Sequence, residues 1–156
     1  MEDDLKRIRA IADYQFGPGC GETLFPEGVT LRYSRNTGRI RHVYLGDILL
    51  ASLRPTDGFF TLSIAGAERL VSNNGDMRFT VMVADEAAEF IAQGRSVFAK
   101  HVIDVGEDIR PGCEVVVLNS LRRVMAVGRA TLNKEEMLTF NVGVAVKVRH
   151  GNREQD

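Results

Sequence analysis

The sequence has few cysteines, no excess of either charge and no long apolar run. Its two cysteines, Cys20 and Cys113, form neither a CxxC pair nor a zinc-like spacing with the three histidines. We therefore expect two free thiols, no disulfide and no metal site. No apolar run approaches the roughly 20 residues that a bilayer span needs, and the charged N-terminus is not a signal peptide. These absences predict a cytoplasmic protein with no membrane attachment.

Common catalytic motifs are absent as well. The chain has no glycine-rich phosphate loop, no HExxH and no GxSxG. Two acidic pairs, Asp85-Glu86 and Glu135-Glu136, each stand at the expected start of a helix, where carboxylates complement the helix dipole. This role is favoured over acid–base catalysis. We therefore predict that the chain is not an enzyme, with no catalytic residues, metal or cofactor.

The charge balance gives no direct sign of a nucleic-acid partner. The 156 residues include 20 Lys and Arg against 21 Asp and Glu, a net charge of −1. Taken alone, this argues mildly against RNA, because phosphate contacts come from clustered Lys and Arg. Net charge does not describe distribution, so the question is whether basic side chains gather on one face.

The first half of the chain predicts a small α+β domain over residues 1–73. Leu5, Ile8, Ala12 and Phe16 recur at helical spacing, and Gly17-Pro18-Gly19 ends the helix. Four or five short antiparallel strands and a short helix at Gly66–Val71 are expected after it. The polar stretch Ser72–Asp76 is the predicted linker.

The second half predicts a partly open β-barrel with short helices over residues 77–151, followed by a tail at 152–156. The expected helices run from an N-cap at Asp85 to Gln93, with Gly94 after it, and from a capping box of Asn133 and Glu136 to Phe140. The expected strands are Arg78–Val83, Ser96–Val105, Glu114–Leu118, Val124–Leu132 and Val144–Arg149. Gly151–Asp156 is polar and without periodicity, so we expect it to lack regular structure. The fold class is α+β.

Four segments resemble the PUA domain, the pseudouridine synthase and archaeosine transglycosylase module. They are Gly94–Lys100, Asp108–Val117 with its Pro111-Gly112 turn, Ala126–Ala130 and Gly143–Arg149, and they occur in the family's order. In the first half, Ala12-Asp13-Tyr14-Gln15-Phe16-Gly17 is similar to the start of the small domain that precedes PUA in archaeosine tRNA-guanine transglycosylase and its stand-alone relatives. Nearly the whole chain thus resembles the C-terminal region of that archaeal enzyme.

This resemblance implies a non-catalytic tRNA-binding protein that presents tRNA to a separate catalytic subunit, such as a transglycosylase. The family's catalytic part resembles a TIM barrel of ~250 residues, for which this chain is too short. Pre-PUA and PUA domains also occur together in translation and ribosome-associated factors, and that alternative stays open.

The resemblance also implies an RNA surface between the first PUA helix, the glycine loop and the last strand. The candidate residues are Gly94, Arg95, Ser96, Lys100, Lys147, Arg149 and His150. Strand alternation places Lys147 and Arg149 on one outward face, so we expect their removal to leave the fold intact. Without the resemblance, such residues are typical of a solvated outer face. Arg39 and Arg41, in the first domain, could extend the basic surface.

Overall fold

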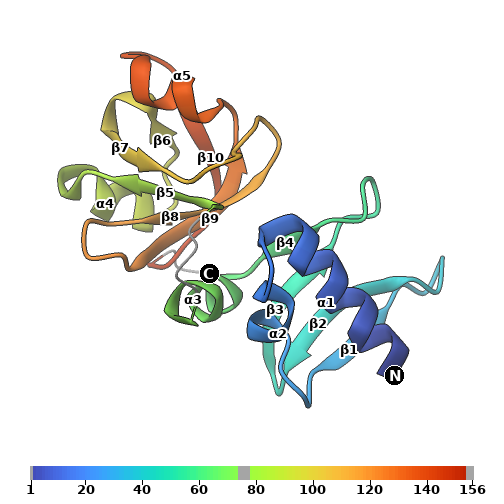
Figure 1. Cartoon of the computed structure of the whole chain (residues 1–156). Helices are drawn as coiled ribbons and strands as arrows, with labels where there is room; N and C mark the ends of the chain where they lie inside the picture. The colour runs from blue at the N-terminus through green and yellow to red at the C-terminus, as the bar shows by residue number, and fades with distance from the viewer. Residues whose placement is uncertain (1, 74–77, 154–156) are drawn as a thin grey trace. The chain divides into compact units, whose positions relative to one another are not determined.

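The computed structural model describes residues 2–73 and 78–153. The chain divides into two compact units, an N-terminal unit of residues 1–76 and a C-terminal unit of residues 77–156 (Figure 1). Ser72, the start of the predicted linker, is still helical, and residues 74–76 lie outside the described part of the chain. Within the described ranges, no helix is both long and apolar enough to cross a membrane.

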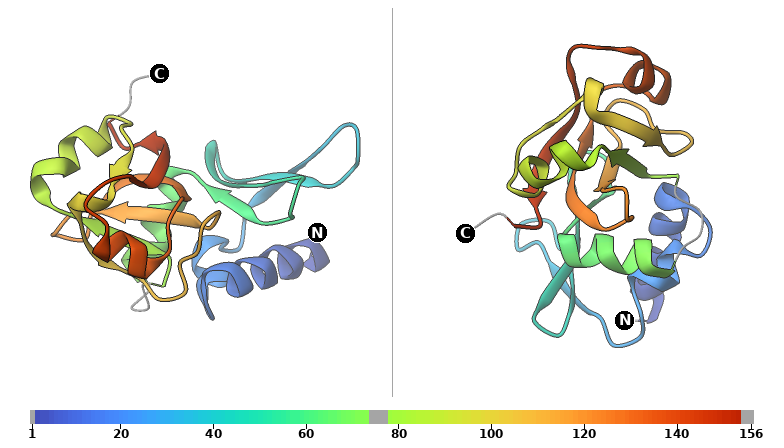
Figure 2. Two further views of the ribbon diagram at one scale, coloured as in Figure 1. Left: turned by 90° about the horizontal axis from the view of Figure 1, so that it is seen from above. Right: turned by 90° about the vertical axis from the view of Figure 1, so that its left-hand side faces the viewer.

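The N-terminal unit is an antiparallel sheet with helices packed on it. Its elements are α1 (Glu2–Phe16), α2 (Cys20–Leu24), β1 (Thr30–Tyr33), β2 (Ile40–Leu45), β3 (Ile48–Leu53), β4 (Phe60–Leu62) and α3 (Ile64–Asn73). The strand order is β1-β2-β3-β4, and α1 lies along one face of this sheet (Figures 1 and 2). The predicted first helix is confirmed, with Ile8, Ala12 and Phe16 buried.

Cross-strand pairing separates the two faces of this sheet. One row of opposite residues is buried and packs with the helices: Leu31, Val43, Ala51 and Leu62. The neighbouring row, whose side chains point to the other face, is polar: Arg32, His42, Ser52 and Thr61. Arg41 is the extra residue at a register shift between the Arg32–His42 and Tyr33–Ile40 pairs, so strand alternation does not fix its face.

The segment from Ala12 to Gly17 has a structural task in this unit. Asp13 accepts a hydrogen bond from the backbone N–H of Gly21 at 2.7 Å, which fixes the start of α2. The Gln15 amide donates to the Phe60 carbonyl and accepts from the Phe60 N–H, both at 2.8 Å. Gly17 ends α1 with a φ of +126°, a conformation that favours glycine. These residues therefore fasten α1 to α2 and to β4.

The C-terminal unit is a nearly closed barrel of six strands. Its elements are β5 (Thr80–Val83), α4 (Asp85–Ala92), β6 (Val97–Phe98), a 3-10 helix η1 (Ala99–His101), β7 (Val102–Val105), β8 (Glu114–Leu118), β9 (Val124–Ala130), α5 (Lys134–Thr139) and β10 (Val144–Gly151). The strand order is β6-β10-β9-β8-β5-β7, and among the described strands only β5 and β8 run parallel. The expected α+β class and barrel are confirmed.

Three local predictions in this unit are wrong. The strand expected from Ser96 to Val105 is broken by η1 into β6 and β7. Asp85 is not the helix cap: Ala84 holds that position, and Asp85 accepts hydrogen bonds from Ser120 instead. The end of the chain is also more regular than expected. Gly151 is buried in β10, and the Arg153 N–H donates to the Ala92 carbonyl at 2.8 Å.

Candidate nucleic-acid interface

Strand β10 brings the predicted RNA-binding residues together along one seam. It pairs with β6 on one side, where Val146 faces Val97, and with β9 on the other, where Lys147 faces Arg129. Arg95 and Ser96 lead into β6 and Lys100 follows it, so these residues run beside the strand that carries Lys147, Arg149 and His150. The eight residues of β10 extend over about 25 Å, so the candidate residues on and beside this strand form a narrow strip, called the β10 strip below.

The two ends of the seam are fixed by backbone contacts. Near the start of β10, the Ala99 N–H donates to the Gly143 carbonyl at 2.9 Å, which places Lys100 there. At the other end, the backbone at Gly151 packs closely on Gly94. A Cβ atom added to Gly151 would lie 2.7 Å from the Gly94 nitrogen. Gly94 itself has a φ of +107° and its N–H donates to Ile91 O at 2.9 Å, as a helix-ending glycine does.

Arg149 carries a paired charge, a feature that the expected outward face shared with Lys147 did not include. Its Nη1 donates to Glu114 Oε1 at 2.9 Å, and its Nη2 donates to the second carboxylate oxygen. The Glu114 side chain is 0% exposed and that of Arg149 32%. Glu114 faces Arg129, which faces Lys147, so the carboxylate lies on the Arg149 side of the sheet. Arg149 neutralises a buried charge.

Lys147 and Arg129, in contrast, are exposed neighbours on adjacent strands. Neither side chain has a bonding partner among the residues that the structure describes. Arg129 was not singled out in the sequence, although it is the only charged residue of β9 and its neighbours there are buried. Charged residues are rarely fully buried unless they are paired, so an isolated charge in an apolar strand favours the outer face, and that signal points to Arg129.

The other candidates along the seam differ in exposure. Arg95 and Lys100 are exposed and, within residues 2–73 and 78–153, have no side-chain partner; Ser96 is half-buried. His150 is exposed on β10. Arg153, beyond the strand, is paired with Glu89 at 2.6 Å. Among the described residues, the cations of this strip whose side chains have no partner are therefore Arg95, Lys100, Arg129 and Lys147.

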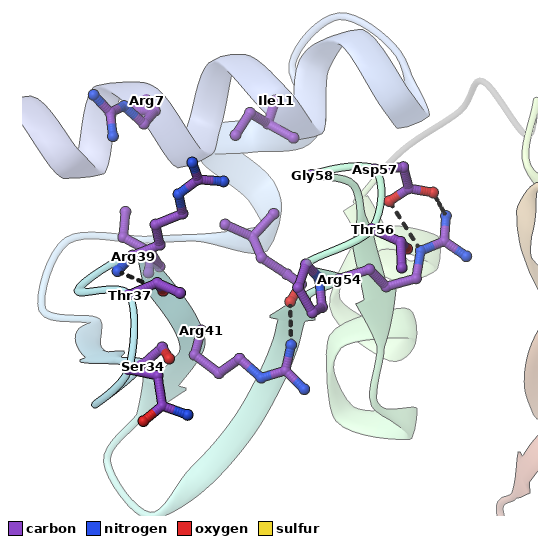
Figure 3. Close-up of a pocket in the computed structure, with 14 residues that line it drawn as sticks. Arg7, Ile11, Ser34, Thr37, Arg39, Arg41, Arg54, Thr56, Asp57 and Gly58 are labelled. Atoms are coloured by element: carbon purple, nitrogen blue, oxygen red, sulfur yellow. Dashed lines mark hydrogen bonds and ion pairs between the residues drawn. The ribbon is translucent and has the colours of Figure 1, made fainter.

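A second basic region lies in the N-terminal unit, in a pocket with a volume of about 910 Å³ (Figure 3). Four arginines line it: Arg7, Arg39, Arg41 and Arg54. Asp57 is the only carboxylate of the lining, and it is paired with Arg54 at 2.8 Å. The pocket is therefore strongly cationic.

Comparison with known families separates the chain at the same place. Residues 6–75 match the family described as patch-forming domain C2 of tRNA-guanine transglycosylase. Residues 79–151 match the PUA domain. The chain combines a C2 domain with a PUA domain. The C2 domain is the N-terminal unit and the PUA domain is the C-terminal unit, so the resemblance seen in the sequence is confirmed.

Relatives of known identity are considerably longer than this chain. A tRNA-guanine(15) transglycosylase from Methanothermobacter thermautotrophicus is 46% identical over 149 residues, which cover 96% of this chain and 23% of that protein. A second, from Thermoplasma volcanium, is 42% identical over 149 residues and is covered to the same 23%. The chain thus spans about a quarter of the length of the relatives it matches.

Solved structures share the fold. A hypothetical protein from Pyrococcus horikoshii superposes with a TM-score of 0.77 at 23% identity, over 99% of this chain and 93% of that one. The fold of a small α+β domain followed by a PUA-like barrel is confirmed by this likeness.

The remaining polar groups of the C2 and PUA domains form no metal-binding cluster in the described residues. In residues 2–73 and 78–153, no group of three or more His, Cys, Asp or Glu side chains is placed to hold a metal ion. Cys20 is buried, Cys113 is half-buried, and neither forms a disulfide in the described residues. In the C2 domain, burial lowers the pKa of His42, and the charges of Arg41 and Arg32 lower it further. The outer face of the C2 sheet is therefore also a cationic environment.

Proposed function

We propose that this chain binds tRNA and does not itself catalyse base exchange. The observation that carries the proposal is the combination of its two domains. A C2 domain and a PUA domain follow one another, and together they match tRNA-guanine(15) transglycosylases over 96% of the chain at 46% identity. A match over both domains supports a shared RNA partner more strongly than a PUA domain alone.

The charges along β10 support the same proposal. Lys147 on β10, Arg129 on β9, and Arg95 and Lys100 on either side of β6 line the strip, and ion pairs with described residues neutralise none of them. Lys and Arg side chains of this kind hold phosphate oxygens and fix the position of the nucleic acid. They do not read bases. The PUA domain is therefore proposed to hold the RNA backbone along β10.

The role we propose is presentation of tRNA to a catalytic modification subunit of the transglycosylase type. About three quarters of the sequence of the matched relatives lies outside the part that this chain covers. In this account that remaining part supplies the exchange of the base, while the C2 and PUA domains supply affinity and orientation. Holding a substrate in the right geometry raises the rate without any chemical group from the binding module.

The test is a guanine-exchange assay on tRNA with a catalytic transglycosylase subunit prepared without its own C2 and PUA domains. We expect the chain alone to show no exchange and its addition to the catalytic subunit to raise exchange at low tRNA concentration. Exchange by the chain alone would contradict the non-catalytic role. Exchange unchanged by its addition would contradict presentation. Co-purification with the small ribosomal subunit instead would favour a ribosome-associated factor.

A further inference from the structure

The C2 domain has a groove whose charge is opposite to that of the pocket lined by four arginines, the arginine pocket. The groove has a volume of about 340 Å³ and lies where the first turns of α1 meet the start of β1. Glu2, Leu5, Glu27, Gly28, Val29 and Leu31 line it. Its floor is apolar, since Val29 and Leu31 are buried and Leu5 is half-buried. The two glutamates are the charged residues of the described lining.

The negative charge of this groove is available to a cation. Glu2 is exposed and has no side-chain partner in the described chain. Glu27 lies 3.8 Å from Arg9 Nη1, but its side chain is 86% exposed, so water screens that pair. None of the described lining side chains can donate a hydrogen bond. The groove therefore suits apolar and basic side chains and is unsuited to the phosphates of RNA.

Strand β1 borders the groove and forms one edge of the C2 sheet. Among the described strands it pairs with β2 alone. In Figure 1, β1 lies at the border of this sheet, near the N-terminal end of α1. Tyr33 at the end of β1 donates from its hydroxyl to Asp4 at 2.6 Å, which holds the helix beside the strand. An edge strand presents unpaired N–H and C=O groups, with which an extended segment of another chain can pair.

We propose that a segment of the catalytic modification subunit docks on β1 as an added strand and places its apolar side chains in this groove. Side chains of a strand alternate between its two faces, so the segment has apolar residues at alternate positions and Lys or Arg beside Glu2 and Glu27. Complementary charge selects such a segment, and the glutamates repel RNA. The proposal rests on the function proposed above and adds to it a protein-binding surface separate from the β10 strip.

The test measures binding of the full chain to the catalytic transglycosylase subunit prepared without its own C2 and PUA domains. Isothermal titration calorimetry without tRNA gives the affinity. The double variant Glu2→Gln with Glu27→Gln removes the charges of the groove. Leu5→Gln places an amide in its apolar floor. Circular dichroism confirms that both variants keep the fold.

Each groove variant has a matched control. Glu22→Gln with Glu68→Gln removes two exposed carboxylates from the same domain outside the groove, so both doubles change the net charge equally. Leu138→Gln makes the same substitution as Leu5→Gln at a leucine of α5 that is 48% exposed. The tRNA affinity of every variant is measured in the absence of the catalytic subunit.

We expect both groove variants to bind the catalytic subunit roughly tenfold more weakly, while the controls and all tRNA affinities match the unaltered chain. If the chain raises exchange and the groove variants bind the subunit as the controls do, the docking site is contradicted and the proposed function stands. Raised exchange without measurable binding to the subunit has the same meaning. Loss of tRNA affinity in the groove variants would show that the groove contacts RNA, which also contradicts protein docking. If the unaltered chain does not bind tRNA, the proposed function fails whatever the groove binds.

Discussion

Arg149 of the PUA domain differs from Arg7 and Arg39 of the C2 domain in what its side chain is bound to. In the PUA domain, Arg149 is held by the buried carboxylate of Glu114. In the C2 domain, Arg7 and Arg39 have no partner within the described residues. Arg149 belongs to a segment that resembles the PUA family, yet its charge is already neutralised. The comparison teaches that the partner of a cation, more than its place in a motif, decides whether it is available to a phosphate.

The largest effect predicted by this comparison is on stability. Arg149→Ala leaves the buried Glu114 carboxylate without its ion pair, and we expect a loss of about 3 kcal/mol in the free energy of unfolding. Urea denaturation followed by circular dichroism measures it. Lys147→Ala, on the same strand, is the control and should stay within ~0.5 kcal/mol of the unaltered protein. Equal stability of the two variants would mean that Arg149 is a surface cation after all.

The next effect concerns RNA affinity in the PUA domain. Lys147→Gln with Arg129→Gln removes two exposed cations that face each other across β9 and β10. We expect tRNA binding to weaken by roughly tenfold and its salt slope to fall by about two units, with stability unchanged. Arg122→Gln with Arg123→Gln, in the exposed loop before β9, is the matched control. Equal losses in both doubles would show that overall charge, and not the strip, governs binding.

The smallest effect sharpens the contrast between the ion pairs themselves. Arg54 and Asp57 pair in a turn of the C2 domain, with side chains 25% and 40% exposed. Because water screens this pair, Arg54→Gln should cost less than ~1 kcal/mol, and the cost should shrink further at high salt. Urea denaturation at low and high salt tests this. A loss as large as that of Arg149→Ala would remove the distinction between the two regions.

Most regular elements could be predicted because their signals are local. The helical spacing of Ile8, Ala12 and Phe16 identified α1. The capping box that begins α5 is present, with the Glu136 N–H donating to Asn133 at 2.8 Å and Glu136 accepting from the Asn133 N–H at 2.9 Å. Such interactions lie within one turn of the chain, so neighbouring residues reveal them.

The missed features depend on contacts between distant residues. The helix α2 was not expected because Asp13, from the preceding helix, supplies the bond at its start. Arg149 and Glu114 are 35 residues apart, so strand alternation could give a direction for Arg149 but no partner. The arginine pocket likewise needs α1 and two turns together.

The affinity of the unaltered chain for tRNA, measured against salt concentration, tests the central claim most directly. If the cations of the β10 strip contact phosphates, the logarithm of the binding constant should fall linearly with the logarithm of the salt concentration. The slope should be about three units or more. Absence of binding at low salt, or an affinity that does not change with salt, would contradict RNA binding through these cations.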